Sequence, residues 1–217
     1  MKRRRNKAIL LAARILSGLF RPQYLPVVGF FLLFRYSIYN IYPASIKRTV
    51  LILVLGGTVV LPYLSIRLWR SIHGWEPQLL RQQDKRFVPY LINIGFYALT
   101  LYLLHHSRLP IIMSGILIAA LMIQASCTFI NIWWKISTHS AGAGGIIGAI
   151  IAYSNIFNFN PLPWLIGAFF VAGLVGSCRM LLRQHSLGQV CGGLIVGTLC
   201  GFAGITHAHI LLDLLNL

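Results

Sequence analysis

Two short polar stretches carry the residues of this chain that are best suited to chemistry. One is Lys135–Ser140, which contains Ser137 and His139, and the other is Arg179–Gln189, which contains His185. One imidazole can attack phosphorus while a second protonates the leaving oxygen, and arginine or lysine cations can hold the remaining phosphate oxygens. Two histidines among cations, with almost no acid nearby, therefore indicate phosphoryl transfer without a metal.

The spacing within the second stretch places several side chains on shared helical faces. Gln189 follows His185 by four residues, so its amide can hydrogen-bond the ring nitrogen that faces it and fix which nitrogen is free to react. Arg179 and Arg183 are one helical turn apart, and both are candidate phosphate ligands. Contact with lipid headgroups explains Arg183 equally well.

Two further features add to this candidate site. A third polar stretch, Arg81–Arg86, contributes clustered cations, of which Lys85 and Arg86 are candidate phosphate ligands. In the first stretch, Ser137 or Ser140 can cap the helix that follows, and the free backbone N–H groups at the start of that helix suit a bound anion.

The composition limits both the class of protein and the kind of site. Of the 217 residues, 57% are hydrophobic and only 10% are charged, whereas an ordinary soluble domain is about 25% charged. The 19 lysines and arginines outnumber 3 acidic residues, which gives a formal net charge of +16. So few carboxylates cannot build a carboxylate metal cage, and the cysteines lie in apolar stretches as packing residues. We therefore expect an integral membrane protein that contacts lipids, with no metal, no cofactor and no nucleic-acid partner.

Seven apolar segments are candidates for membrane spans, since a spanning helix needs about 20 mainly apolar residues. They are Leu25–Tyr42, Thr49–Trp69, Phe87–Leu104, Leu109–Trp134, Ala141–Phe157, Pro163–Arg179 and Leu187–Ala208. The predicted fold is all-α, a polytopic membrane bundle of about six to seven transmembrane helices over residues 24–217. If all seven cross, the three polar stretches lie at one end of the bundle, together with the N-terminus. On the last span, Gly193-x3-Gly197-x3-Gly201 permits close approach of a neighbouring helix.

Residues 1–23 are expected to form a distinct basic segment. Its apolar part, Ala8–Phe20, is too short to span, so the segment is either an interfacial helix held by anionic headgroups or only a topology signal. The first expected span is unusual because Arg35 lies in its middle. A central arginine costs at least about 2.5 kcal/mol unless it is paired or reaches the interface.

Two sequence motifs stand out: Ile136-Ser137-Thr138-His139, and Cys178-Arg179-x5-His185-x3-Gln189. They resemble the second and third motifs of the type 2 phosphatidic acid phosphatase superfamily, Pro-Ser-Gly-His and Ser-Arg-x5-His-x3-Asp. These lipid phosphate phosphatases share a fold with vanadium haloperoxidases. The resemblance covers about half of the chain. It implies that His185 is the nucleophile that forms a phosphohistidine, that His139 is the general acid, and that Arg179 and Ser137 bind phosphate.

The first family motif, Lys-x6-Arg-Pro, is degenerate in this chain. Lys85, Arg86 and Pro89 are present, but no lysine stands seven residues before an Arg-Pro pair. A near match does occur at Arg14-x6-Arg21-Pro22. It lies much farther before His139 than the family usually places this motif, and we interpret it as a coincidence.

The resemblance implies a metal-independent membrane phosphatase that hydrolyses a lipid phosphate or diphosphate, either a polyprenyl diphosphate or a glycerolipid phosphate. Gln189 stands where the family usually has aspartate, and His185-Ser-x-x-Gln189 is similar to the His-Thr-x-x-Gln of the branch that dephosphorylates dolichyl diphosphate. The alternative is a weak or inactive family member that binds anionic lipid phosphates. A bacterial cytoplasmic membrane is the expected location; protein partners and the side that carries the site stay open. The basic N-terminal end favours the cytoplasm, whereas the family more often presents its site to the periplasm or lumen.

Overall fold

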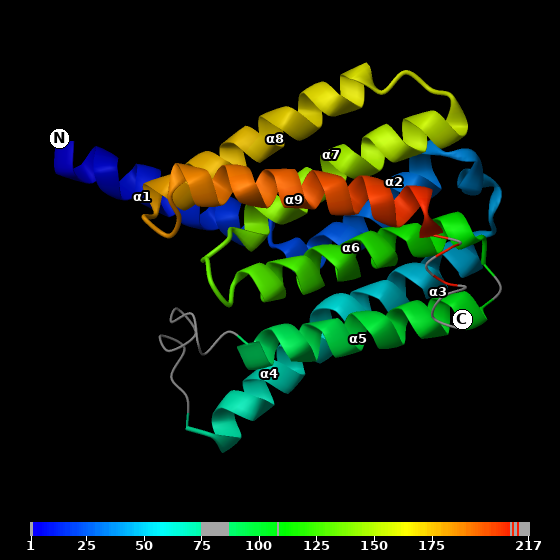
Figure 1. The fold of residues 1–217 in the computed structure, drawn as a ribbon, viewed down its shortest axis with the longest axis horizontal. Helices are drawn as coiled ribbons and strands as arrows, with labels where there is room; N and C mark the ends of the chain where they lie inside the picture. Colours follow the sequence, from blue (N-terminus) through cyan, green and yellow to red (C-terminus); the bar gives the residue numbers. More distant parts are fainter. Residues whose placement is uncertain (1, 75–86, 108, 209, 211, 213–217) are drawn as a thin grey trace.

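The computed structural model describes residues 2–74, 87–107, 109–208, 210 and 212, and this part of the chain is a bundle of long helices (Figure 1). Its α-helices are α1 (Lys2–Leu19), α2 (Leu25–Tyr36), α3 (Ala44–Leu55), α4 (Leu61–Ile72), α5 (Phe87–His106), α6 (Ile111–Ile130), α7 (Thr138–Phe157), α8 (Leu162–Leu181) and α9 (Leu187–Thr206). Short 3₁₀ turns cover Pro22–Tyr24 and Ile38–Ile41, and a π-helical turn, Gly56–Val60, joins α3 to α4. Proline stands in the first turn of α2, α4 and α8, where its missing N–H removes no helical hydrogen bond.

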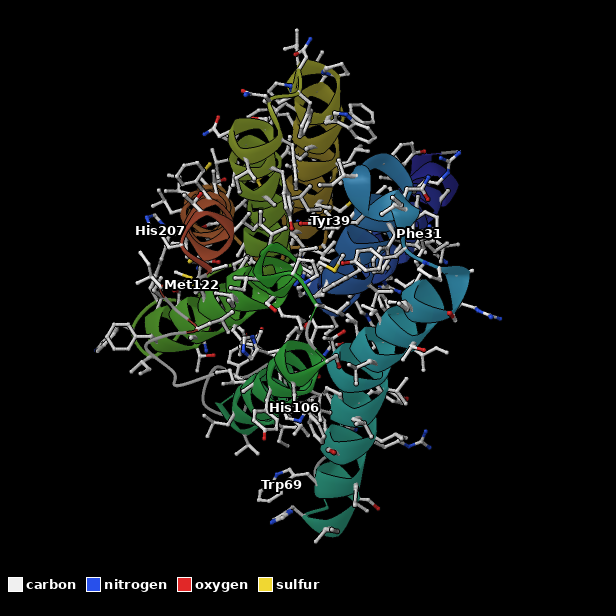
Figure 2. All side chains as sticks on the ribbon, turned by 90° about the vertical axis from the view of Figure 1, so that its right-hand side faces the viewer. Phe31, Tyr39, Trp69, His106, Met122 and His207 are labelled. Atoms are coloured by element: carbon white, nitrogen blue, oxygen red, sulfur yellow. The ribbon has the colours of Figure 1, made fainter. Side chains whose placement is uncertain are left out.

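Seven helical segments are long and apolar enough to cross a membrane, as the sequence predicts. They are Lys7–Tyr36, Ala44–Ile72, Val88–His106, Ile111–Ile130, Thr138–Phe157, Leu162–Leu181 and Leu187–Thr206. The outer surface of the bundle is correspondingly apolar: Phe31, Trp133 and Phe170 are each more than half exposed. Figure 2 shows side chains pointing outward around the whole bundle, with Trp69 at its periphery. The protein is therefore an all-α, multi-pass membrane bundle.

The first span differs from the predicted Leu25–Tyr42. Helix α2 has 12 residues and is about 18 Å long, shorter than the roughly 30 Å of a bilayer's hydrocarbon core. The candidate span instead begins at Lys7 and joins α1 to α2 across the Pro22–Tyr24 turn. Helix α1 follows the long axis of the bundle and packs on α8, so Ala8–Phe20 is joined to the first span instead of lying across the end of the bundle (Figure 1).

This change also places Arg35 differently. Arg35 lies in the last turn of α2, one residue before the candidate span ends at Tyr36, and its guanidinium carbon is 5.4 Å from the centre of the Tyr36 ring. The arginine is exposed at the end of a span and not in its middle. The large cost of a central arginine therefore does not arise.

Successive long helices run in opposite directions, so the connections gather at two ends of the bundle (Figure 1). The end that holds the start of α1 also holds the connection between α6 and α7 and the connection between α8 and α9. We call this end the basic end. Two of the three predicted polar stretches, Lys135–Ser140 and Arg179–Gln189, are brought together there, as expected. The third stretch, Arg81–Arg86, lies outside the described residues.

Helices α7 and α9 pack so closely that only glycine fits at several contact positions. A Cβ atom added at Gly197 would overlap the carbonyl group of Ala141, and one added at Gly201 would overlap that of Gly145. In the other direction, a Cβ at Gly148 would overlap the carbonyl of Thr198. The prediction that the glycine repeat permits close helix approach is confirmed, and this contact fixes the first turn of α7 against the first turn of α9.

Candidate active site

The first turn of α7 is held by Ser137, the residue that caps it. Its Oγ accepts the backbone N–H of Ser140 at 3.3 Å, and the two serine hydroxyls are 2.9 Å apart. The backbone N–H of Ser137 donates to the carbonyl oxygen of Gln189 at 3.3 Å, which ties this turn to α9. His139 is the second residue of α7, so it lies at the positive end of the helix dipole, where an anion is stabilised.

The end of α8 explains the five-residue spacing between Arg179 and His185. Arg183 adopts a left-handed conformation with φ of 52°; its N–H donates to the carbonyl of Met180 at 2.9 Å, and the N–H of Gln184 donates to the carbonyl of Arg179 at 3.1 Å. This pair of bonds is the Schellman motif, which ends a helix and reverses the chain. His185 follows directly, so the turn returns it toward the last turn of α8.

The start of α9 orients the His185 ring. Ser186 and Gln189 form a capping box, in which Gln189 Oε1 accepts the backbone N–H of Ser186 at 3.2 Å. The same oxygen is 3.1 Å from Nδ1 of His185. Because an N–H can only donate, the atom that faces Ser186 is the amide oxygen, and Nδ1 must carry the proton that completes the second contact. In the neutral ring, Nε2 is therefore the nitrogen with the lone pair.

Helix α1 contributes a residue that joins two of the site side chains. Nη1 of Arg179 donates to Oγ of Ser17 at 2.9 Å, and the His139 ring hydrogen-bonds to the main chain of Ser17. Ser17 is only 6% exposed, so it lies between α7 and α8 as a bridge. One nitrogen of His139 is held by this bond, and the other is the nitrogen that can exchange a proton with a ligand.

The electrostatic surroundings of His139 are positive. Among charged groups, Arg179 and His185 act on its ring most strongly, and Arg21 acts on it as well. The three acidic residues of the chain, Glu76, Asp84 and Asp213, all lie outside the described residues. The groups that the structure brings around His139 are thus cationic or neutral, a set that suits an anion with several oxygens.

Comparisons of the chain with family models, with curated proteins and with solved structures found no match.

Four of the predicted site residues come together at the basic end: His139, Arg179, His185 and Gln189. Ser137 is adjacent, but it is fully buried and its hydroxyl is engaged with Ser140. A phosphate would reach that hydroxyl only by breaking the cap of α7. The geometry therefore gives Ser137 a positioning role and leaves the N–H groups of the first turn of α7 as the better anion donors.

The remaining predicted phosphate ligands are less well placed or lie outside the described residues. Arg183 is exposed in the turn after α8, where its backbone completes the Schellman motif. Lys85 and Arg86 belong to the part of the chain that is not described.

Sequence reasoning missed two residues of the site, Ser17 and Arg21. The signal was the near match Arg14-x6-Arg21-Pro22, which we interpreted as a coincidence because it lies so far before His139. Arg21 follows the end of α1 in an extended conformation, whereas Arg14 and Ser17 are three residues apart on α1 and share one helical face. That face meets the site because α1 packs on α8, so distance along the chain does not separate this motif from the histidines in space.

Proposed function

We propose that this protein is a metal-independent phosphatase that hydrolyses a lipid phosphate or diphosphate in the membrane through a phosphohistidine intermediate. The observation that carries the proposal is the bond between Nδ1 of His185 and Oε1 of Gln189, at 3.1 Å. With the proton on Nδ1, Nε2 is the nitrogen that carries the lone pair in the neutral ring, and the His185 ring acts electrostatically on His139 together with Arg179. The resemblance to type 2 phosphatidic acid phosphatases, drawn from the sequence motifs, supports the same chemistry.

In the first step of the proposed reaction, Nε2 of His185 attacks phosphorus. A P–N bond forms while the bond between phosphorus and the leaving oxygen breaks, and His139, which takes up a proton when the anionic substrate binds beside it, gives that proton to the leaving oxygen. Arg179 and Arg21 hold the phosphate oxygens as their charge redistributes. Gln189 supports the step because its oxygen faces the Nδ1 proton of a ring that becomes positively charged.

In the second step, water attacks the phosphorus of the phosphohistidine. His139 is now neutral and takes a proton from the water as the new P–O bond forms, while the P–N bond breaks and returns the lone pair to Nε2 of His185. Inorganic phosphate leaves and both histidines regain their starting states. Every proton is exchanged through an imidazole, so the cycle requires no carboxylate.

The membrane setting supports a lipid substrate. His139 lies in the first turn of α7 and His185 in the connection between α8 and α9, at one end of helices that are long and apolar enough to span a bilayer, where a lipid headgroup would meet the protein. Cations at this level attract anionic headgroups, at about 1 kcal/mol for each residue near the surface.

Phosphate release from purified protein tests the proposal. We expect release from undecaprenyl diphosphate or phosphatidate in the presence of EDTA, and no release after His185→Ala. His139→Ala should lower the rate by about 10²–10⁴-fold, the usual contribution of a general acid. His207→Ala is the matched control, because His207 is an exposed histidine that follows α9 at the opposite end of the bundle. Full activity of the His185→Ala protein, or loss of activity in EDTA, would overturn the proposal.

The second candidate, a protein that binds lipid phosphates without turning them over, is favoured by one observation. Gln189 is uncharged, so it stabilises a positively charged His185 less than a carboxylate would. Saturable binding of phosphatidate vesicles with no phosphate release on the lipid panel would support this candidate against the phosphatase.

A further inference from the structure

Helix α1 turns a polar residue toward the bundle. Within residues 7–19, Ala13 and Ser17 are buried, at 3% and 6% exposure, and they lie four residues apart on the face that packs against α8. The opposite face carries exposed apolar side chains, among them Leu11 and Ile15. A hydroxyl buried in an apolar interface is costly unless it is hydrogen-bonded, so the partners of Ser17 are the reason that a serine can lie there.

The hydroxyl of Ser17 holds the guanidinium group of Arg179. Nη1 of Arg179 donates to Oγ of Ser17 at 2.9 Å, from the last turn of α8. A guanidinium group carries five N–H donors in one rigid plane, so a bond at one nitrogen sets the direction of the whole group. The contact therefore restricts where this long, flexible side chain places its charge.

The main chain of Ser17 holds the ring of His139. In an α-helix each N–H points back toward the carbonyl four residues earlier, so the group that Ser17 offers to the ring is its carbonyl oxygen. The N–H of Phe20 donates to the carbonyl of Leu16 at 3.0 Å, which places the Ser17 carbonyl in the last turn of α1, where carbonyl oxygens point past the helix end. A carbonyl oxygen only accepts, so the ring nitrogen that faces it carries a proton.

We propose that Ser17 is a positioning residue, which fixes the direction of Arg179 with its hydroxyl and the tautomer of His139 with its carbonyl oxygen. This rests on the proposed function, because the two side chains that it holds are the proposed phosphate ligand and the proposed general acid. The family resemblance gives Ser17 no role, since it is among the six unspecified positions of the near match Arg14-x6-Arg21-Pro22. One residue of α1 thus keeps an imidazole of α7 and a cation of α8 in register with each other.

Binding of inorganic phosphate to the purified protein tests the hydroxyl without requiring turnover. Ser17→Ala should weaken binding about tenfold, because a hydrogen bond to a charged group contributes at least this much. Ser17→Thr keeps a hydroxyl and should bind phosphate nearly as tightly as the wild type. In an Arg179→Lys protein, which keeps a cation but lacks the guanidinium plane, Ser17→Ala should weaken binding by less than about twofold, since the hydroxyl acts through Arg179.

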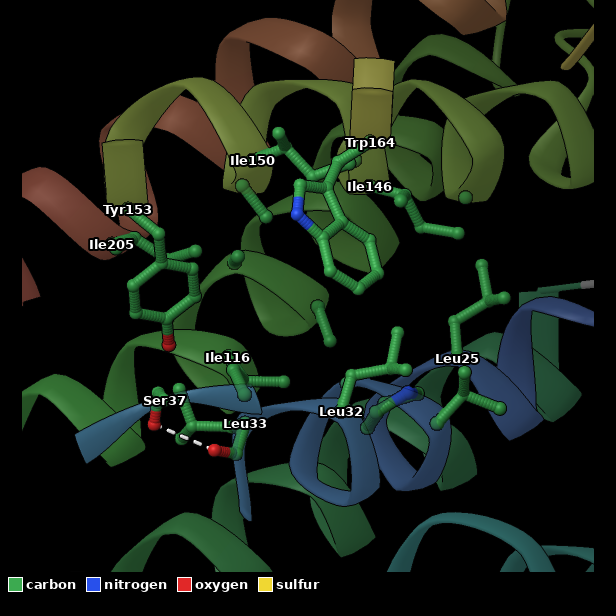
Figure 3. A pocket seen from close by; sticks show the side chains of 18 of the residues that line it. Leu25, Leu32, Leu33, Ser37, Ile116, Ile146, Ile150, Tyr153, Trp164 and Ile205 are labelled. Atoms are coloured by element: carbon green, nitrogen blue, oxygen red, sulfur yellow. Dashed lines mark hydrogen bonds between the residues drawn. The ribbon is translucent and has the colours of Figure 1, made fainter. Parts of the chain in front are cut away.

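Ser37→Ala is the matched control. The hydroxyl of Ser37 donates to the carbonyl of Leu33 at 2.6 Å, in an apolar groove between α2, α6 and α7 (Figure 3). Ser17, His139 and Arg179 are not among the residues that line this groove. Ser37→Ala should therefore lower the melting temperature without changing the affinity for phosphate, which separates a loss of stability from a loss of positioning.

Nitrogen NMR of the histidine rings tests the carbonyl contact. In phosphate-free protein with isotopically labelled histidine, the neutral His139 ring should be a single tautomer, and it should stay so in Ser17→Ala because the carbonyl remains. Ala13→Trp places a large ring between α1 and α8 and should let the His139 ring exchange between tautomers. Leu11→Trp, at a position that is 58% exposed, should leave the ring unchanged. Ala13→Leu is the smaller wedge should Ala13→Trp fail to fold.

The outcomes separate the positioning role from catalysis. Unchanged phosphate affinity in Ser17→Ala, an equal loss in Ser17→Thr, or an unchanged tautomer of His139 in the folded Ala13 variants would overturn the positioning role even if the protein is an active phosphatase. The expected losses in a protein that hydrolyses no lipid phosphate would refute the phosphatase alone and leave Ser17 as the residue that orients a phosphate-binding site.

Discussion

Replacing Gln189 by glutamate should make the proposed enzyme faster. The substitution keeps the shape of the side chain and an oxygen 3.1 Å from Nδ1 of His185, but it adds a negative charge opposite the ring that becomes positive during attack. It also preserves the capping box, because glutamate is a favoured residue at this position of α9 and a negative charge suits a helix N-terminus.

The magnitude follows from the geometry. Two unit charges about 4 Å apart attract by about 4 kcal/mol at an effective dielectric constant of 20, but removing the carboxylate from water opposes most of this gain. A hydrogen bond to a charged group contributes about 1.5–3 kcal/mol, against about 0.5–1.5 for a neutral pair. The difference of about 1 kcal/mol corresponds to roughly a fivefold faster phosphorylation of His185.

Rapid-quench measurement of alcohol or phosphate release in a single turnover gives this rate directly. Gln189→Ala is the opposite change: it removes the partner of Nδ1 and breaks the capping box, so both the rate and the melting temperature should fall. A Gln189→Glu protein that folds normally and is slower than the wild type, or a Gln189→Ala protein that is equally fast, would refute the assignment of Nε2 of His185 as the nucleophile.

Two further substitutions test the framework that holds the site. Arg183→Gly should raise the free energy of unfolding by about 1 kcal/mol relative to Arg183→Ala, because glycine adopts the left-handed conformation of the Schellman turn without steric cost. Equal stability of the two variants would contradict this prediction. An equal loss of activity in both variants would identify the charge of Arg183 as a substrate contact. Gly197→Ala should lower stability by about 1–3 kcal/mol, because its Cβ would overlap the Ala141 carbonyl, whereas Gly167→Ala in α8 has open space and should be neutral or slightly stabilising. Thermal unfolding in detergent measures both pairs, and equal effects at the two glycines would argue against the close packing of α7 on α9.

The helical class, the number of spans and the shared end of two polar stretches could all be predicted, because each depends on local composition or on counting crossings. The contact between His185 and Gln189 could be predicted, but not for the right reason. His185 precedes Ser186, the N-cap of α9, so the two side chains do not share a helical face, and the capping box brings Gln189 to the ring. The start of the first span could not be predicted from the sequence, because Arg21 separates the apolar run of α1 from that of α2. Only the packing of α1 on α8 shows that both halves belong to the bundle.

The roles of Arg21 and Ser17 could not be predicted from local sequence patterns. Their neighbours in space, His139 and Arg179, lie on α7 and α8, and only the packing of α1 brings them together. Ser137 is the converse case. The family resemblance implies that Ser137 binds phosphate, yet in the structure its hydroxyl caps α7, and a buried helix end requires such a cap.

The described part of the site is assembled from helix ends, and the orienting bonds that the structure shows for its two imidazoles come from an amide side chain and from the main chain. The capping box determines which ring nitrogen of His185 carries the proton, and the main chain of Ser17 holds His139. The Schellman turn fixes the position of His185 relative to Arg179. Each of these devices uses backbone groups that a helix terminus leaves unsatisfied, so the orienting bonds add no charge to the site. In the proposed mechanism, a bound anion supplies negative charge among the cations that the described residues bring to the site. It follows that binding of phosphate, and not only its hydrolysis, should depend on keeping position 189 neutral: the glutamate that speeds attack should also weaken the binding of inorganic phosphate as a competitive inhibitor.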